Sequence, residues 1–250
     1  MNIVALTQAR VGSSRLPIKV LKTINEESLL KIHLNRILKS ELISELIVAT
    51  TREKGVSEIL RIASECNLNC YQGDLNNVLD RFYQAVKNKN ADYVVRLTSD
   101  CPLIDAKLID QVIKYTIEND LDYCSNVLDE MFPDGQDIEV FKFSALEKAW
   151  NEVVLDSDKE HVTPYIHRNS TYRNKKMFKS DMFPFDTNYN HVRLTVDEPD
   201  DFIVIEKIIK ELGTNRSWLD YTKYYLESGI SKINSNIKRN EGYQKSIKNS

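Results

Sequence analysis

Three cations surround a short turn near the N-terminus of the chain. The stretch QARVGSSRLPIKVL follows an apolar run, contains a Gly-Ser-Ser turn at residues 12–14, and carries Arg10, Arg15 and Lys19. Backbone N–H groups of such a turn can form an anion nest, and the cations add the charge that a triphosphate needs. An ordinary loop with solvated cations explains the same residues at this stage, so both interpretations stay open.

Two familiar phosphate-binding patterns are absent from the sequence. The chain has only seven glycines, and neither GxGxxG nor GxxxxGK[ST] occurs in it. The first pattern is typical of dinucleotide-binding folds and the second of P-loop proteins. The opening stretch therefore gives no support to either class.

Asp100 and Asp197 each follow an apolar, strand-like segment, YVVRLTS and HVRLTV. Ligands of an open α/β sheet bind outside the carboxyl ends of its strands, so the fold can bring two such carboxylates together. Paired carboxylates with few further ligands suit Mg²⁺, which keeps several waters and bridges phosphate oxygens. The alternative is N-capping or turn formation, because Asp197 precedes Glu-Pro and Asp100 precedes Cys-Pro.

Other side chains are weaker candidates. Asp80 and Arg81 can face a ribose or phosphate from a helix, or form a solvated pair. Glu160 and His161 resemble an acid–base pair, but Glu160 also fits a capping box with Ser157.

The remaining histidines and the cysteines indicate no metal site. His33, His167 and His191 have no metal-ligand spacing to one another and are expected to be ordinary core or surface residues. The four cysteines form no CxxC pair and lie in or beside apolar segments, which favours reduced thiols: Cys66, Cys70, Cys101 and Cys124.

Short β-rich runs alternate with amphipathic helices through the first half of the chain, which predicts a mostly parallel sheet covered on both faces. The rhythm changes after Asp122, where FPDGQDIEVFKF predicts a turn and an inserted or antiparallel strand. The segment HVRLTVD is expected to form a further strand before Pro199 opens a helix. We expect one domain over residues 1–230 and a polar C-terminal tail over 231–250.

Size and charge limit the partners. A chain of 250 residues with 42% hydrophobic content can bury a sizeable core. Its net charge of −3 argues against a nucleic-acid binder and leaves room for a local cationic pocket, so the partner is expected to be small. With no signal-peptide core and no apolar run long enough for a membrane span, we expect a cytoplasmic protein.

The chain resembles the SpsF-type cytidylyltransferase family and, more distantly, the CMP-Kdo and CMP-sialic acid synthetases. The similar stretches follow the family's order over roughly residues 2 to 210, and the tail segment NEGYQKS is similar as well. They are QARVGSSRLPIKVL, IVATTREKG, YQGDLNNVLDRFYQA, VVRLTSDCPLID, SNVLDEMFPDGQDIEVFKFSALEKAW, EHVTPY and VRLTVDEPDDF.

The resemblance implies a three-layer α/β/α nucleotide-diphospho-sugar transferase (Rossmann-like) fold with a mostly parallel mixed sheet, CTP as substrate, Mg²⁺ as cofactor, and often a homodimer. It assigns metal binding to Asp100 and Asp197, and catalytic roles to Arg10, Lys19 and Asp100. The nucleotide-binding residues that it implies are Ala9, Arg10, Gly12, Ser13, Arg15, Lys19, Ala49, Thr50, Arg81 and Asp100.

One position departs from the family pattern. SpsF-like members usually have glycine in RLPGK where this chain has Ile18. A β-branched residue is expected to restrict the backbone there to ordinary φ values and to make the loop less adaptable.

The predicted reaction is transfer of CMP from CTP to an acidic or phosphorylated sugar-like acceptor, with release of pyrophosphate, in surface polysaccharide or glycoconjugate biosynthesis. The precedents of Kdo and sialic acid do not fix the acceptor, because PDGQDIEVF matches only the SpsF-like branch. Two alternatives are a glycosyltransferase that uses a nucleotide sugar and a non-catalytic nucleotide-binding protein.

Overall fold

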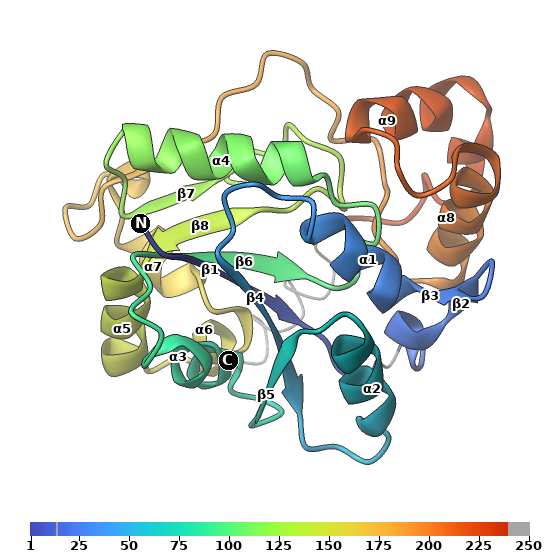
Figure 1. Ribbon diagram of the computed structural model, residues 1–250. Helices are drawn as coiled ribbons and strands as arrows, with labels where there is room; N and C mark the ends of the chain where they lie inside the picture. The colour runs from blue at the N-terminus through green and yellow to red at the C-terminus, as the bar shows by residue number, and fades with distance from the viewer. Residues whose placement is uncertain (14, 240–250) are drawn as a thin grey trace.

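A seven-stranded sheet runs through the centre of the computed structural model, which describes residues 1–13 and 15–239 (Figure 1). Its strand order is β5-β4-β1-β6-β8-β7-β9, and a separate two-stranded sheet pairs β2 with β3. The strands are β1 (Ile3–Gln8), β2 (Thr23–Ile24), β3 (Glu27–Ser28), β4 (Glu45–Thr51), β5 (Asn69–Gly73), β6 (Tyr93–Thr98), β7 (Tyr123–Ser125), β8 (Glu139–Lys142) and β9 (Ser180–Met182).

Helices cover both faces of the sheet, as Figure 1 shows for α4 on one side and α3 and α5 on the other. The α-helices are α1 (Leu29–Ile37), α2 (Ser57–Glu65), α3 (Val78–Val86), α4 (Ala106–Glu118), α5 (Phe143–Glu152), α6 (Asp156–His161), α7 (Pro164–Arg168), α8 (Pro199–Leu212) and α9 (Trp218–Glu227). Short 3₁₀ turns are η1 (Lys19–Leu21), η2 (Thr171–Arg173) and η3 (Ile230–Ile233).

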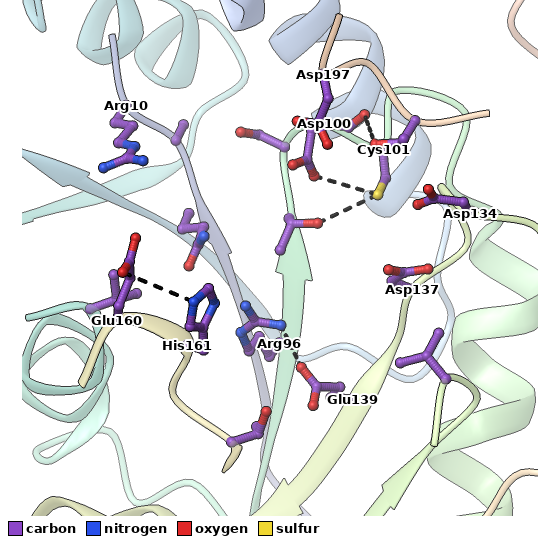
Figure 2. A pocket seen from close by; sticks show the side chains of 18 of the residues that line it. Arg10, Arg96, Asp100, Cys101, Asp134, Asp137, Glu139, Glu160, His161 and Asp197 are labelled. Atoms are coloured by element: carbon purple, nitrogen blue, oxygen red, sulfur yellow. Dashed lines mark hydrogen bonds and ion pairs between the residues drawn. The ribbon is translucent and has the colours of Figure 1, made fainter. Parts of the chain in front are cut away.

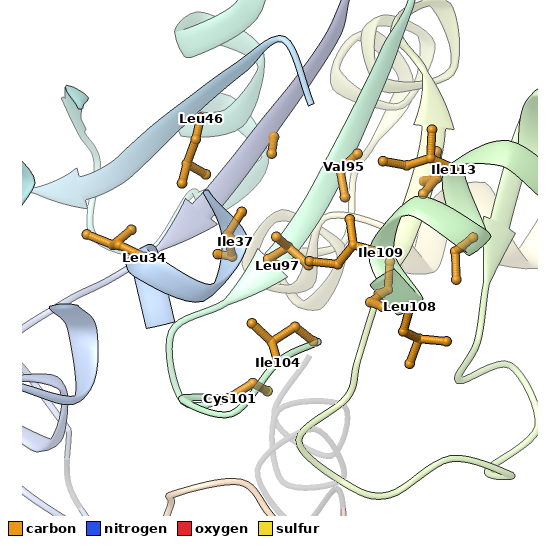
Figure 3. Close-up of a cluster of buried hydrophobic side chains, with 14 of the residues drawn as sticks. Leu34, Ile37, Leu46, Val95, Leu97, Cys101, Ile104, Leu108, Ile109 and Ile113 are labelled. Atoms are coloured by element: carbon orange, nitrogen blue, oxygen red, sulfur yellow. The ribbon is translucent and has the colours of Figure 1, made fainter. Parts of the chain in front are cut away.

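Alternation along the central strand explains the three layers. Ile3 and Ala5 of β1 pack in one core cluster with α1, α2 and α4, part of which Figure 3 shows. Val4 and Leu6 point to the opposite face and pack with α3 and α5. Because successive side chains of a strand face opposite sides, a strand apolar at every position needs cover on both. The predicted three-layer α/β/α fold is confirmed.

The break in rhythm after Asp122 marks the antiparallel part of the sheet. β1, β4, β5 and β6 are mutually parallel, whereas β8 runs antiparallel to both β6 and β7. The turn before β8 contains Gly135 at φ 110°, and a Cβ there would lie 2.6 Å from the carbonyl carbon of Leu194. Only glycine accepts both that φ and that approach, so the turn packs directly against the chain before α8.

The predicted strand HVRLTVD is wrong. This segment contributes only an isolated bridge between Arg193 and Asp134, and forms none of the named strands of the described chain. Its backbone groups bond instead to the Pro-Asp-Gly turn and to the loop after β6: Leu194 N–H donates to Asp134 O at 2.6 Å and Val196 N–H donates to Asp100 O at 2.8 Å. Hydrogen bonds to these two loops therefore satisfy backbone groups of the segment that were expected to pair with a neighbouring strand.

The described part of the predicted tail packs on the domain. Asn234 is fully buried, and its side-chain amide donates to the backbone oxygen of Arg193 at 3.2 Å and to Asp201 at 3.0 Å. The remainder of the tail, with the segment NEGYQKS, lies outside the described residues. The predicted boundary after residue 230 stays a prediction. None of the helices within residues 1–13 and 15–239 has the length and apolarity needed to cross a bilayer.

His33 on α1 predicts how stability depends on pH. It is fully buried, with Nδ1 2.8 Å from Cys101 O and Nε2 2.8 Å from Thr7 Oγ1. The carbonyl only accepts, so Nδ1 donates and Nε2 accepts from the hydroxyl. Burial lowers the pKa of His33 to about 4.

Protonation of the unfolded chain should therefore destabilise the protein in mild acid. The unfolded His33 takes up its proton near pH 6.5, above the folded pKa, so its contribution is complete above about pH 6.5 and falls as pH drops toward 4, by about 1.4 kcal/mol per pH unit. Urea unfolding at several pH values should show a shallower slope in His33→Gln, while His191→Gln, at an exposed histidine, should keep the wild-type slope. Equal slopes in all three proteins would contradict this assignment.

Candidate active site

One large pocket of about 790 Å³ lies beyond the carboxyl ends of β1 and β6. Figure 2 shows side chains from several segments converging on it, with Asp100 and Asp197 close together and Glu160 and His161 on another side. The loop after β1, the loop after β6, strand β8 and the segment before α8 all contribute to the lining. The sheet topology thus brings together residues that lie far apart in the sequence.

Lys19 joins the two predicted metal-binding aspartates. Its Nζ donates to Asp197 Oδ1 at 2.6 Å and to Asp100 Oδ2 at 3.2 Å. Neither carboxylate caps a helix: Asp105 is the N-cap of α4 and Glu198 that of α8. The capping alternative is therefore wrong, although Asp100 does lie in a turn after β6. The expected convergence of Asp100 and Asp197 is confirmed.

The charges of this triad support one another in a half-buried setting. Burial alone would lower the pKa of Lys19, but Asp100 and Asp197 raise it. Burial alone would raise the pKa of Asp100, but the Lys19 ammonium holds it well below its usual range. Both groups are consequently charged at neutral pH, as a site for phosphate and metal requires.

A buried arginine fixes the backbone that carries Asp197. Arg193 Nε and Nη2 bind the two oxygens of Asp201 at 2.8 and 2.9 Å. Asp201 Oδ2 in turn accepts from the backbone N–H groups of Asp197 and Glu198, each at 3.0 Å. This network orients the start of α8 and thereby aims Asp197 at the pocket.

The other loop cations also line the pocket. Arg15 Nη2 lies 3.1 Å from Asp197 Oδ1, and its Nη1 lies 3.2 Å from Glu198 Oε1. Arg10 is exposed and forms no ion pair with another residue of the described chain. Its charge is therefore available to a ligand, and the whole loop after β1 presents cations to one cavity.

Three further predicted residues of the nucleotide site lie on the lining, at Gly12, Ser13 and Arg81. Arg81 is 2% exposed, donates to Asp74 O at 3.1 Å, and has a buried Nε with no partner in the described structure. Burial and then Arg10 lower the pKa of Arg81 to about 10. Asp80 instead binds the indole N–H of Trp150 at 2.9 Å. The anion-nest hypothesis also includes Ser14, which lies outside the described residues.

Ala9 lines the pocket, but Ala49 and Thr50 do not. Ala9 N–H donates to Ala49 O at 3.1 Å, which joins the ends of β1 and β4 behind the lining. Both Ala49 and Thr50 are fully buried, and the Thr50 hydroxyl has no partner in the described structure. Their role beside the base stays a prediction from the resemblance.

Ile18 does not keep ordinary φ values, so that expectation is wrong. Its backbone is left-handed, with φ 51° and ψ 29°, immediately before η1. This conformation costs an L-residue roughly 1–2 kcal/mol, and glycine adopts it freely. The loop therefore keeps the geometry that glycine suits, and isoleucine bears strain there.

Relief of this strain is measurable. Ile18→Gly should unfold at higher urea concentration than Ile18→Ala, with a free energy of unfolding about 1 kcal/mol larger, because alanine keeps the left-handed penalty. The Ile18 side chain is 51% exposed, so both changes remove little packing. If Ile18→Ala is at least as stable as Ile18→Gly, the left-handed backbone at residue 18 does not destabilise the protein.

Two further charged residues of the pocket lining, Arg96 and Glu139, were not predicted as site residues. Arg96 Nη1 pairs with Glu139, its direct cross-strand partner between β6 and β8, and Glu139 also accepts from the Tyr123 hydroxyl at 2.7 Å. Both Arg96 and Glu139 line the pocket. The available signal was an arginine inside the apolar run VVRLT, because a charged residue in a buried strand needs a partner.

Glu160 and His161 also line the pocket, and the predicted capping role of Glu160 is wrong. α6 begins at Asp156 and ends at His161, which places Glu160 in the last turn of the helix, away from its first turn. His161 Nε2 lies 4.0 Å from Glu160 Oε2. Burial and then Arg96 lower the pKa of His161, so its ring is neutral near pH 7 and able to accept a proton.

The carboxylate oxygens of Asp100 and Asp197 are of the ligand type that a hard divalent cation prefers. Asp100 and Asp197 already share one cation, the Lys19 ammonium, so a positive charge can occupy the space between them. Within residues 1–13 and 15–239, no cluster of three or more His, Cys, Asp or Glu is arranged as a metal site. A metal held by two carboxylates would complete its coordination with waters and phosphate oxygens, as Mg²⁺ usually does.

Comparison with known proteins places the chain in a family. The family model described as Cytidylyltransferase matches residues 4–233. The chain is 36% identical over 245 residues to the uncharacterized protein MJ1063 of Methanocaldococcus jannaschii, covering 96% of this chain and 97% of that protein. It is 28% identical over 226 residues to the spore coat polysaccharide biosynthesis protein SpsF of Bacillus subtilis, covering 85% and 88%.

A relative that matches about half of the chain and a solved structure are also cytidylyltransferases. The 3-deoxy-manno-octulosonate cytidylyltransferase of Bdellovibrio bacteriovorus is 32% identical over 121 residues, covering 48% of this chain and 47% of the relative. The structure of a cytidylyltransferase from Leptospira borgpetersenii superimposes with a TM-score of 0.87 at 30% identity, covering 95% of this chain and 98% of the other. The chain thus belongs to the cytidylyltransferase family and is a CTP-dependent nucleotidyltransferase.

Proposed function

We propose that the protein transfers CMP from CTP to an acidic or phosphorylated sugar-like acceptor and releases pyrophosphate. The observation that carries this proposal is the convergence of the β1-loop cations with Asp100 and Asp197 in one pocket. The name of the relative SpsF supports a place in surface polysaccharide or glycoconjugate biosynthesis. The names of the 3-deoxy-manno-octulosonate cytidylyltransferases support a sugar acid as acceptor.

The side chains divide the work of the reaction. The hydroxyl oxygen of the acceptor attacks the α-phosphorus of CTP, a new oxygen–phosphorus bond forms, and the bond to pyrophosphate breaks in line with it. The hydroxyl proton leaves to water. Arg10, Arg15 and Lys19 would bind the β- and γ-phosphates and neutralise the charge that develops on the leaving pyrophosphate. Asp100 and Asp197 would hold Mg²⁺, which, when bound, lowers the pKa of the attacking hydroxyl and screens the α-phosphate.

The acceptor would bind beside Arg96, Glu139 and His161, which line the same pocket. An acceptor with a carboxylate or phosphate would meet a guanidinium and hydrogen-bonding groups there. Mg²⁺ as the metal, and a homodimer as the assembly, are parts of the proposal that come from the family resemblance.

Pyrophosphate release measured with each of the four ribonucleoside triphosphates, against a panel of sugar acids and sugar phosphates, tests the proposal. We expect release from CTP that depends on one acceptor class and on added Mg²⁺. Sugar transfer from a nucleotide-sugar donor would support a glycosyltransferase instead. CTP binding without pyrophosphate release across the whole panel would support a non-catalytic nucleotide-binding protein.

A further inference from the structure

We propose that Lys19 closes the metal site in the free protein and that the triphosphate opens it by drawing the ammonium away. The inference rests on the proposed function, because it takes Asp100 and Asp197 as the metal ligands. It predicts that a divalent cation binds the free protein weakly and binds strongly only together with nucleotide. The two ligands would then enter as a coupled pair.

The two carboxylates are occupied by cations of the chain itself. Lys19 Nζ lies 2.6 Å from Asp197 Oδ1 and 3.2 Å from Asp100 Oδ2. Arg15 Nη2 lies 3.1 Å from the same Asp197 oxygen. Mg²⁺ binds carboxylate oxygens at about 2.0–2.1 Å in a nearly octahedral shell. An ammonium between the two aspartates and a metal on the same oxygens exclude each other by both volume and charge.

The cations differ in their freedom to leave. Arg193 Nη2 lies 3.8 Å from Asp197 Oδ2. The Arg193 guanidinium is fixed, however, because its Nε bonds to Asp201 and its Nη1 bonds to Asp134 at 2.5 Å. Lys19 carries its charge on a flexible four-carbon stem from the loop after β1. The exchange therefore concerns Lys19 above all, with Arg15 as its neighbour.

A triphosphate supplies the alternative partner that the ammonium needs. Both Lys19 and Arg15 line the pocket, as does Arg10, so phosphate oxygens entering it meet all three side chains. Each contact that Lys19 makes with phosphate weakens its hold on Asp100 and Asp197, and the released negative charge attracts the metal. By linkage, the metal must strengthen nucleotide binding by the same factor as the nucleotide strengthens metal binding.

Binding of Mn²⁺ to the nucleotide-free protein tests the inference without any turnover. Free aqueous Mn²⁺ gives an electron paramagnetic resonance signal that is lost on binding, so a titration yields the dissociation constant. Lys19→Met should bind Mn²⁺ at least about tenfold more tightly than wild type, in the range typical of coupled sites. Lys22→Met is the matched control: it removes the same charge from a lysine off the pocket lining that contacts Phe202, and it should bind Mn²⁺ as wild type does.

A second variant and a second ligand complete the test. Arg15→Met should also tighten Mn²⁺ binding, but less, since Lys19 remains in place. For wild type, adding Mn²⁺ should raise the affinity for α,β-methylene-CTP. The factor by which Mn²⁺ raises that affinity should be at least about tenfold smaller in Lys19→Met. Complexes of metal and analogue in solution are common to both proteins, so the difference between the proteins reports the coupling.

The outcomes separate this inference from the proposed function. Equal Mn²⁺ affinities of wild type, Lys19→Met and Arg15→Met would overturn the inference, even if wild type released pyrophosphate from CTP normally. Tighter Mn²⁺ binding by Lys19→Met would uphold it, even if no acceptor supported pyrophosphate release.

Discussion

Asp100→Asn should lower the rate of pyrophosphate release from CTP by on the order of 10²–10³-fold, the cost typical of removing one charge-stabilising group from a reacting centre. Asparagine keeps the size of the side chain but loses the charge that binds Lys19 at 3.2 Å and that the proposed metal needs. The measurement is the turnover rate at saturating CTP and acceptor, with the acceptor found in the screen. Lys19→Ala should reduce the rate by a similar factor.

A change of the same kind nearby controls for charge alone. Asp200 is exposed in the first turn of α8, three residues from Asp197, and is not on the lining of the large pocket. Asp200→Asn should therefore keep the wild-type rate. Near-normal turnover of Asp100→Asn, in a protein with unchanged melting temperature, would remove Asp100 from the catalytic centre.

Arg193→Met should have the largest effect on stability, lowering the free energy of unfolding by about 3–5 kcal/mol. Asp201 is fully buried and receives two charged hydrogen bonds from Arg193, and Asp134 receives a third. Methionine fills much of the same volume but leaves the buried Asp201 without its main counter-charge, and it removes one of the two arginines that act on Asp134. Urea unfolding followed by circular dichroism measures the loss.

A surface pair on α8, the helix that carries Asp201, provides the comparison. Lys210 pairs with Glu206 at 2.9 Å across one turn of α8, and its side chain is 58% exposed. Lys210→Met should cost less than about 0.5 kcal/mol, because exposed pairs gain little from their charge. Similar losses for the two variants would mean that burial does not govern the Arg193 network. Arg193→Lys should recover only part of the loss, since an ammonium cannot bind both Asp201 oxygens in the planar geometry of a guanidinium.

The parallel half of the fold was predictable because the local hydrophobic pattern of each strand already shows which of its faces must be buried. A strand such as Ile3–Gln8 that is apolar at successive positions must be covered on both sides, and the helices between such strands supply that cover. The segment 191–197 shows the opposite case. It is as apolar as a strand, but its backbone groups bond to the turn at Gly135 and to the loop after β6.

The convergence of the loops after β1 and β6 on one pocket was predictable for a related reason. The carboxyl ends of parallel strands meet at one edge of a sheet, so polar residues after β1 and β6 had to lie near each other. The pairing of Arg96 with Glu139 was not readable from the sequence, because it depends on the register of two antiparallel strands joined by a long connection. Register is set by packing across the sheet, which a linear pattern does not encode.

The sequence by itself determined the α/β class, the cationic loop around Arg10 and Lys19, and the place of Asp100 after a strand, because these follow from local periodicity and from where strands end. Asp197 was reached through an expected strand that the structure does not form. Only the tertiary structure decided that Lys19 bridges both aspartates, that Arg193 and Asp201 orient the second of them, and that Ile18 adopts the left-handed backbone of a glycine. The physical reason is that charge pairing and backbone strain depend on distances across the fold, and those distances exist only after the core has packed.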